Sequence, residues 1–268
     1  SPRSLSAGIA QRRQPLPFRK LSFAKSSGGI RPGPTWLWPV SSERGGQMKS
    51  PSERNPAFAE RLSRSISSPM ATAPPKLFDR NLVRLHRDRA AARYDDYAFL
   101  KERESSQLVE RLMDTTKTFE RALDLGAHDG RAAQKLRASG RVGAVDAADA
   151  SAEFVAGMKA DGLEAFQLDE EEDAFETGRY DLVTSVLSLH WVNDLPGMLV
   201  RIRQGLKPDG LFLGCLFAGG TLAELRACLI EAESEIHGGA SARLSPLPGL
   251  QDMAALMQRA GFALPVAD

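Results

Sequence analysis

The sequence contains few cysteines, few histidines and no long apolar run, and each shortage excludes a class of protein. The two cysteines, Cys215 and Cys228, lie singly in apolar stretches, which indicates reduced thiols rather than a disulfide framework. The four histidines are scattered, and His86 and Asp88 of the motif HRD would point to different sides of a helix. We therefore expect no metal site. No apolar run reaches the roughly 20 residues that cross a bilayer.

Positive charge is concentrated at the start of the 268-residue chain. Residues 1–69 carry twelve lysines or arginines against three acids, and their Ser-, Pro- and Gly-rich composition cannot bury enough apolar surface to fold. We interpret residues 1–75 as a disordered basic segment, which is either a mitochondrial transit peptide or mistranslated sequence upstream of a true start at Met70. The remainder is acidic overall, which argues against a nucleic-acid partner.

Residues 76–268 show the pattern of one α/β domain. A helical pattern over residues 78–113 predicts a helical cap at about 78–114, and KPDG, residues 207–210, predicts a turn. Short apolar segments alternate with helical ones and predict strands at residues 121–126, 141–149, 165–169, 180–189 and 211–220. This alternation predicts a doubly wound, mainly parallel sheet that is covered by helices on both faces.

Glycines and acids follow the predicted strands, and in doubly wound sheets ligands bind at the carboxyl ends of strands. Gly126 permits a tight turn, and Gly130 lets the next helix pack near the strand. Asp149 lies about 20 residues after the turn, where a carboxylate can accept hydrogen bonds from ribose hydroxyls. Asp169 can accept one from an exocyclic amine such as that of adenine. The structural alternative is a plain turn at Gly126 and an Asp149 that caps the helix starting near Ser151.

The details of the glycine turn distinguish between cofactors. The stretch DLGAHDG, residues 124–130, is not G-x-G-x-x-G, and His128 lies where a pyrophosphate would need bare backbone. Asp124, two residues before the first glycine, suits a cationic or ammonium group instead. These features favour S-adenosylmethionine over NAD.

With these residues the chain resembles the class I S-adenosylmethionine-dependent methyltransferases, a Rossmann-like fold. Within them it is similar to the family of the mitochondrial complex I assembly factor described as a protein-arginine hydroxylase, with its bacterial homologues, and more distantly to the malonyl-carrier-protein methyltransferase of biotin synthesis. The resemblance covers about residues 78–268 and rests on LFDRNLVRLHRDRAA, SLHWVNDLPG, LKPDGLFLGCLFAGGTLAELR and LPGLQDMAALMQRAGF. It implies two further strands after the final FALPVAD, so we expect the C-terminal strands to be truncated.

The resemblance also implies roles for single residues. It puts Gly126 and Ala127 against the methionine moiety, Asp149 on the ribose, and Asp169 with Glu170 near adenine. The full set of cofactor-binding residues that we expect is Asp124, Gly126, Ala127, Gly130, Asp149, Ser151, Asp169, Glu170 and Leu187.

The stretch SLHWVNDLPG, residues 188–197, crowds polar and aromatic side chains at the end of a predicted strand. The resemblance implies that His190 and Trp191 lie beside the sulfonium and face the substrate, and we expect both to be catalytic. The ordinary pKa of a histidine would let His190 act as a base at neutral pH. The alternative is local structure, in which Trp191 is a core aromatic residue and His190 a polar residue flanking a helix. In either case Asn193 or Asp194 is expected to cap a helix that has Pro196 in its first turn.

Three functions remain open at this stage. The first is an enzyme that modifies a protein substrate, such as a complex I subunit, by methylation or by hydroxylation. The second is an O-methyltransferase for a carrier-protein-bound or small-molecule acid, and the third is a non-catalytic scaffold that binds S-adenosylmethionine. We expect a protein of the bacterial cytoplasm or, alternatively, of the mitochondrial matrix with peripheral contact to the inner membrane.

Overall fold

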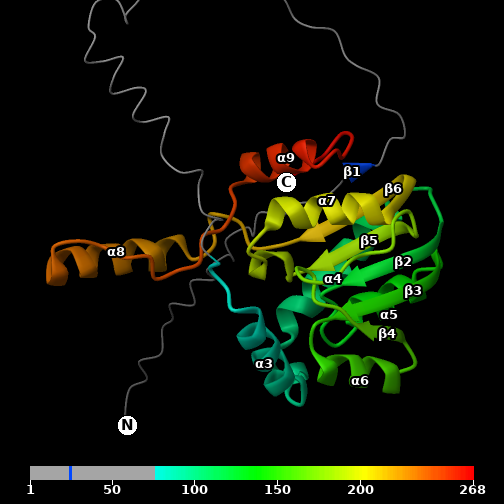
Figure 1. Cartoon of the computed structure of the whole chain (residues 1–268), viewed down its shortest axis with the longest axis horizontal. Coiled ribbons are helices and arrows are strands. Elements are labelled where there is room, and N and C mark those ends of the chain that lie inside the picture. The colour runs from blue at the N-terminus through cyan, green and yellow to red at the C-terminus, as the bar shows by residue number, and fades with distance from the viewer. Residues whose placement is uncertain (1–23, 26–75) are drawn as a thin grey trace, which may run out of the picture. The chain divides into compact units, whose positions relative to one another are not determined.

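The computed structural model describes residues 24–25 and 76–268, which form a six-stranded sheet in the order β1-β6-β5-β2-β3-β4 (Figure 1). The strands are β1 (Ala24–Lys25), β2 (Phe119–Leu125), β3 (Val142–Asp149), β4 (Glu164–Gln167), β5 (Tyr180–Val186) and β6 (Leu206–Cys215). All pairs among β2 to β6 are parallel. The chain adds β3 and β4 on one side of β2 and then β5 and β6 on the other, which confirms the doubly wound sheet.

Three helices connect parallel strands of the described residues: α5 (Arg131–Ala138), α6 (Ala152–Ala160) and α7 (Leu195–Gly205). Two helices precede β2, α3 (Arg80–Ala91) and α4 (Phe99–Met113), and two follow β6, α8 (Ala223–His237) and α9 (Leu250–Arg259). The helical cap differs from a single helix, since a short 3-10 helix at Tyr94–Tyr97 separates α3 from α4. The break lets α4 pack on the sheet while α3 lies next to α6 (Figure 1).

Strand β6 differs from its predicted structure both where it begins and where it ends. The predicted turn at residues 207–210 lies inside β6, where Asp209 has a φ of 59° and the pairing with β5 shifts register between Tyr180 and Leu182. The turn residues are thus accommodated as an irregular, bulged part of the strand, which ends at Cys215 rather than at residue 220.

One short part of the amino-terminal segment, residues 24–25, is described. Residues 24–25 form β1, which pairs antiparallel with β6 through Ala24 and Phe212 and through Lys25 and Leu211. This pairing was not expected for a segment interpreted as disordered. The rest of residues 1–75 lies outside the described residues, and so does Met70.

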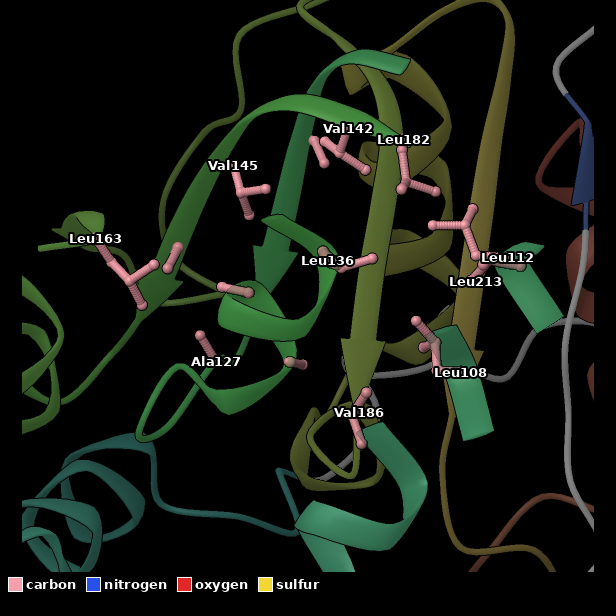
Figure 2. Close-up of a cluster of buried hydrophobic side chains, with 14 of the residues drawn as sticks. Leu108, Leu112, Ala127, Leu136, Val142, Val145, Leu163, Leu182, Val186 and Leu213 are labelled. Atoms are coloured by element: carbon pink, nitrogen blue, oxygen red, sulfur yellow. The ribbon is translucent and has the colours of Figure 1, made fainter. Parts of the chain in front are cut away.

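Two apolar clusters hold helices against opposite faces of the sheet. On one face α7 and α9 pack against the strands, through Leu123, Val183, Met198, Leu199, Ile202, Phe212, Met253 and Met257. On the other face α4, α5 and α6 do so, through Leu108, Leu112, Leu136, Val145, Val155, Met158, Leu182 and Leu213 (Figure 2). Successive residues of β5, Leu182 and Val183, belong to opposite clusters, as the pleat of a strand requires.

Helix α8 is the exception, because none of its residues is buried. Its apolar side chains Leu225 and Ile230 are 45% and 48% exposed. No helix among the described residues is long and apolar enough to span a membrane.

The two environments predict different effects of the same substitution. Leu182→Ala should lower the free energy of unfolding by about 2–5 kcal/mol, because it opens a cavity between β5 and the helices of a fully buried cluster. Leu225→Ala in α8 is the matched control and should change it by no more than about 0.5 kcal/mol. Urea denaturation followed by circular dichroism measures both values. Equal losses in the two variants would contradict this assignment of core and surface.

Candidate cofactor-binding site

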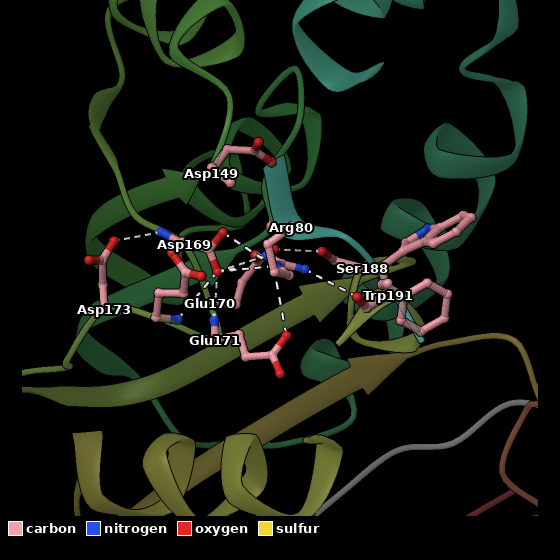
Figure 3. A network of polar contacts seen from close by, with 12 residues as sticks. Arg80, Asp149, Asp169, Glu170, Glu171, Asp173, Ser188 and Trp191 are labelled. Atoms are coloured by element: carbon pink, nitrogen blue, oxygen red, sulfur yellow. Dashed lines mark hydrogen bonds and ion pairs between the residues drawn. The ribbon is translucent and has the colours of Figure 1, made fainter. Parts of the chain in front are cut away.

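The carboxyl ends of β2, β3 and β5 meet at one edge of the sheet. Asp124 of β2 pairs in register with Ala147 of β3 and with Thr184 of β5, so the loops after these strands start side by side. The loop after β4 contributes Asp169 and Glu170 to the same edge (Figure 3). This is the place at which the sequence predicts a ligand.

Gly126 makes the turn that leaves β2. Its φ is 67°, and its N–H donates to the carbonyl oxygen of Ala148 at 2.9 Å. A Cβ atom at this position would lie 2.1 Å from the hydroxyl oxygen of Ser188 and 3.0 Å from a carboxylate oxygen of Glu170. Only glycine therefore fits. Gly130 caps the start of α5 with a φ of 75°, and a Cβ atom there would lie 2.6 Å from the side chain of Leu163.

His128 lies between the two glycines with a φ of 55°, a backbone conformation that favours glycine. Its backbone N–H donates to Asp149 at 2.9 Å, and its ring atom Nδ1 lies 2.8 Å from the carbonyl oxygen of Gly126. The ring stacks on Tyr94, with 5.4 Å between ring centroids. Burial lowers the pKa of His128 well below its usual value, and the nearby cations Lys101 and Arg87 lower it further, so the ring is neutral at pH 7.

Asp149 ends β3 with a fully buried carboxylate. It accepts hydrogen bonds from the backbone N–H groups of His128 and Ser151, both at 2.9 Å. Ser151 caps α6 by accepting from the N–H of Phe154, and its own hydroxyl donates to Asp88 at 2.6 Å. The structure thus brings Asp149 and Ser151 together, and the helix cap is made by Ser151 rather than by Asp149.

Asp169 and Glu170 are held by Arg80 of α3 (Figure 3). The guanidinium of Arg80 lies 3.1 Å from Asp169 and 2.5 Å from Glu170, and it also donates to the carbonyl oxygen of Trp191 at 3.1 Å. Glu170 is buried and accepts a further hydrogen bond from the hydroxyl of Ser188 at 2.9 Å. Burial alone would raise the pKa of Glu170, but Arg87 and Arg80 outweigh it and keep the carboxylate ionised.

Sequence reasoning missed three cations of the site, Arg80, Arg87 and Lys101. Arg87 of α3 donates to Asp149 at 3.3 Å, to Glu170 at 3.1 Å and to Ser188 at 2.9 Å. Lys101 of α4 donates to the carbonyl oxygens of Val186 at 2.6 Å and Gly126 at 3.0 Å. The signal for the arginines was their spacing of seven residues, which places both on one side of a helix.

Three expected residues lie at the inner end of the site. Asp124 is fully buried and accepts a hydrogen bond from Thr184 at 3.1 Å, and burial raises the pKa of its carboxyl group although Lys101 opposes the shift. Its second carboxylate oxygen has no partner among the described residues. Ala127 is buried behind the turn, and Leu187 is half-buried with a φ of 52° at the end of β5.

His190 and Trp191 form a short 3-10 helix, Leu189–Trp191, directly after β5. His190 is buried with its ring centroid 4.6 Å from that of Phe217, and its Nδ1 has no partner among the described residues. Burial, with a contribution from Arg87 and Lys101, lowers the pKa of His190 to about 4. Such a ring is a weak proton acceptor, which corrects the expectation of a base poised for neutral pH.

Trp191 is 41% exposed and touches Phe78 edge-on, so it is not a core residue. The stretch after it folds as expected, because Asp194 caps α7 by accepting from the N–H of Gly197 at 2.9 Å, with Pro196 in the first turn. Asn193 instead bonds to both backbone polar groups of Phe78 and so ties α3 to this loop.

The chemistry of the site fits a cofactor that is rich in hydrogen-bond donors. The site's hydrogen-bond acceptors are the carboxylates of Asp149 and Glu170, bonded to Arg87, and the carbonyl oxygens of Gly126 and Val186, bonded to Lys101. S-adenosylmethionine offers matching donors in its ribose hydroxyls, its ammonium group and its adenine amine. No group of three or more metal-ligating side chains occurs in the described part of the chain.

Comparison with known proteins agrees with this chemistry. Residues 94–265 match the family described as methyltransferase domain. Over 215 residues the chain is 39% identical to the human protein named arginine-hydroxylase NDUFAF5, mitochondrial. This alignment covers 76% of the chain and 62% of that relative. Over 201 residues it is 34% identical to the malonyl-acyl-carrier-protein O-methyltransferase of Halorhodospira halophila. That alignment covers 71% of the chain and 64% of the relative. The chain thus spans less than two thirds of the length of both.

A solved structure, the DhpI-SAM-HEP complex, shares the fold with a TM-score of 0.53 at 18% identity, over 72% of this chain and 92% of that one. The match to the family extends from the 3-10 helix before α4 to residue 265 and so includes every strand of the site. The chain therefore belongs to the methyltransferase domain family, and S-adenosylmethionine is the cofactor that its strand-end site fits.

Proposed function

We propose that this protein is an S-adenosylmethionine-dependent enzyme that modifies a protein substrate during the assembly of respiratory complex I. The observation that carries the proposal is the buried edge of carboxylates and carbonyl oxygens around Asp149, which matches the donors of the cofactor. Support for a protein substrate comes from the 39% identity to a relative that is named an arginine hydroxylase. That relative is also named mitochondrial, which supports a mitochondrial site of action.

The residues of the site have distinct roles in this proposal. Asp149 accepts hydrogen bonds from the ribose hydroxyls, and Glu170 with Asp169 receives the adenine amine. The carbonyl oxygens of Gly126 and Val186 hold the ammonium group. When bound, S-adenosylmethionine supplies an electrophilic methyl group on a sulfonium centre. The protein contributes mainly alignment of the acceptor with that group.

His190 and Trp191 face the acceptor in this proposal. With a pKa of about 4, the ring of His190 is neutral at pH 7 and positions the acceptor more readily than it removes a proton. Trp191 offers an exposed aromatic face for binding a substrate side chain.

A second candidate is methylation of a carboxylic acid that is carried by a protein or is a free small molecule. It is favoured by the low pKa of His190, because a carboxylate is already ionised at neutral pH and needs no base. The 34% identity to a malonyl-acyl-carrier-protein O-methyltransferase supports it as well. Hydroxylation, by contrast, would need an oxidant in addition to the residues described.

Mass spectrometry of the modified partner separates these functions. A candidate complex I subunit and a malonylated carrier protein are each incubated with S-adenosylmethionine, with and without this protein, and in a parallel series dioxygen and a reductant are added so that hydroxylation can also occur. A subunit heavier by one methylene group supports methylation of a protein side chain, and one heavier by an oxygen atom supports hydroxylation. A methyl ester on the carrier protein supports the second candidate. No change in either partner would indicate a scaffold without catalysis.

Asp149→Asn should weaken binding of S-adenosylhomocysteine by about 1.5–3 kcal/mol, because the amide replaces a charged acceptor for the ribose. Asp146→Asn is the matched control, since Asp146 is a buried acid of the same strand that pairs with Arg121 away from the site. It should lower the melting temperature and leave affinity unchanged. Isothermal titration calorimetry measures both. Equal losses of affinity would contradict the assigned role of Asp149.

His190→Ala and Trp191→Ala should each reduce modification of the partner at least about tenfold and spare cofactor affinity, because both side chains lie beyond the cofactor groups bound by Asp149. In the unaltered protein the rate should show no step from His190 between pH 6 and 8. A group with a pKa near 4 is deprotonated throughout that range. Loss of cofactor binding in proportion to loss of activity would show that the pair only supports the fold.

A further inference from the structure

The acceptors at the strand ends are already bonded to cations from the amino-terminal helices. One guanidinium nitrogen of Arg87 lies 3.3 Å from each carboxylate oxygen of Asp149 and 3.1 Å from Glu170. Two further hydrogen bonds to the Asp149 carboxylate come from the backbone N–H groups of His128 and Ser151. The direction from which ribose hydroxyls would approach Asp149 is thus the one that Arg87 takes.

Lys101 takes a second set of acceptors. Its ammonium group is buried and donates to the carbonyl oxygens of Val186 at 2.6 Å and of Gly126 at 3.0 Å. An ammonium group of a bound amino-acid cofactor has the same charge and the same three donors as the head of a lysine. The lysine therefore satisfies these carbonyl oxygens in the way that the ligand would.

The surroundings hold Arg87 in its charged form, whereas burial lowers the pKa of Lys101 although Asp124 and Asp149 oppose the shift. The side chain of Arg87 is 7% exposed, and Asp149 and Glu170 raise its pKa although burial opposes its charge. The other carboxylate oxygen of Glu170 accepts a hydrogen bond from Arg80, which lies on the same face of α3 as Arg87. Removing the cations without a replacement would leave buried carboxylates unpaired, which is strongly unfavourable. A donor-rich ligand is a replacement of the required kind.

We propose that the helical segment Arg80–Met113 is an internal competitor for the cofactor, in which Arg87 and Lys101 mimic the ribose and ammonium donors and must withdraw before the ligand binds. The proposal rests on the proposed function, because it assumes that the cofactor uses these acceptors. It makes the described arrangement the closed form of the protein. Only a form in which the segment has shifted is competent to bind.

This competition has a measurable consequence. The apparent dissociation constant is the intrinsic one divided by the fraction of molecules in the competent form. Substitutions that weaken the closed form raise that fraction, so they tighten binding although they remove side chains from the site. Because the effect arises in the free protein, its size is the same for S-adenosylmethionine, which carries a sulfonium charge, and for S-adenosylhomocysteine, which does not.

Calorimetry with both ligands on four full-length proteins tests the proposal. The proteins are the unaltered chain, Arg87→Leu, Lys101→Met and the control Arg84→Leu, whose exposed arginine on α3 donates to Asn81 and not to the strand-end acceptors. Arg87→Leu and Lys101→Met should each bind both ligands about tenfold tighter or more, by one common factor for the two ligands. Arg84→Leu should match the unaltered protein. If Arg87→Leu fails to fold, Arg87→Gln removes the same charge and keeps a polar side chain.

Other outcomes overturn the proposal in distinguishable ways. Unchanged or weaker binding in the Arg87 and Lys101 variants, with normal binding by the control, would reject competition and leave the cofactor site standing. A larger gain for S-adenosylmethionine than for S-adenosylhomocysteine would also reject it, because it would show that the cations remain beside the bound sulfonium. Absence of binding in all four proteins would overturn the proposed function and the competition together.

Discussion

Carboxylates that lose contact with water must find other donors, and this protein buries three of them at one edge of its sheet: Asp124, Asp149 and Glu170. Each is placed there by a strand end or by the loop that follows it. Backbone N–H groups donate hydrogen bonds to the carboxylate of Asp149, and the hydroxyl of Thr184 donates one to the carboxylate of Asp124. The remaining charge is balanced by cations that come from α3 and α4.

This balance explains the organisation of the amino-terminal helices. Arg80 and Arg87 lie on the same side of α3, and Lys101 comes from the first turn of α4, where its side chain is buried. The 3-10 helix at Tyr94–Tyr97 lies between them, where the chain changes direction. Helix α3 therefore contacts the strand-end acids, while α4 packs on the sheet. The same cations that stabilise the closed form carry the donor groups that a cofactor would bring. Stability of the free protein and access to the site are therefore opposed in this fold.

The sequence was sufficient to predict the parts of the site that depend on local pattern. Apolar runs gave the parallel strands, and the residues just after them, Gly126, Asp149 and Glu170, do meet at one edge. The break between α3 and α4 could not be predicted, because no proline or glycine marks residues 92–98. The bulge at Asp209 was misread as a turn for a related reason, since the turn residues are real but the strand continues through them.

The partners of the acids were beyond prediction for a different reason. Arg87 meets Asp149 across 62 residues of chain and Glu170 across 83, so the pairing depends on how α3 packs and not on any local signal. The pKa of His190 likewise depends on burial by distant elements, and sequence alone suggested an ordinary histidine. The residue types at strand ends can be predicted from a sequence, whereas the burial and neighbouring charges that determine their pKa values cannot.

A crystal structure of the protein with S-adenosylhomocysteine tests the central claim most directly. The account predicts ribose hydroxyls on the Asp149 carboxylate and the ligand's ammonium group on the carbonyl oxygens of Gly126 and Val186. It also predicts that the guanidinium of Arg87 and the ammonium group of Lys101 have left those atoms. A ligand bound elsewhere, or bound while Arg87 still contacts Asp149 and Lys101 still contacts both carbonyl oxygens, would contradict it.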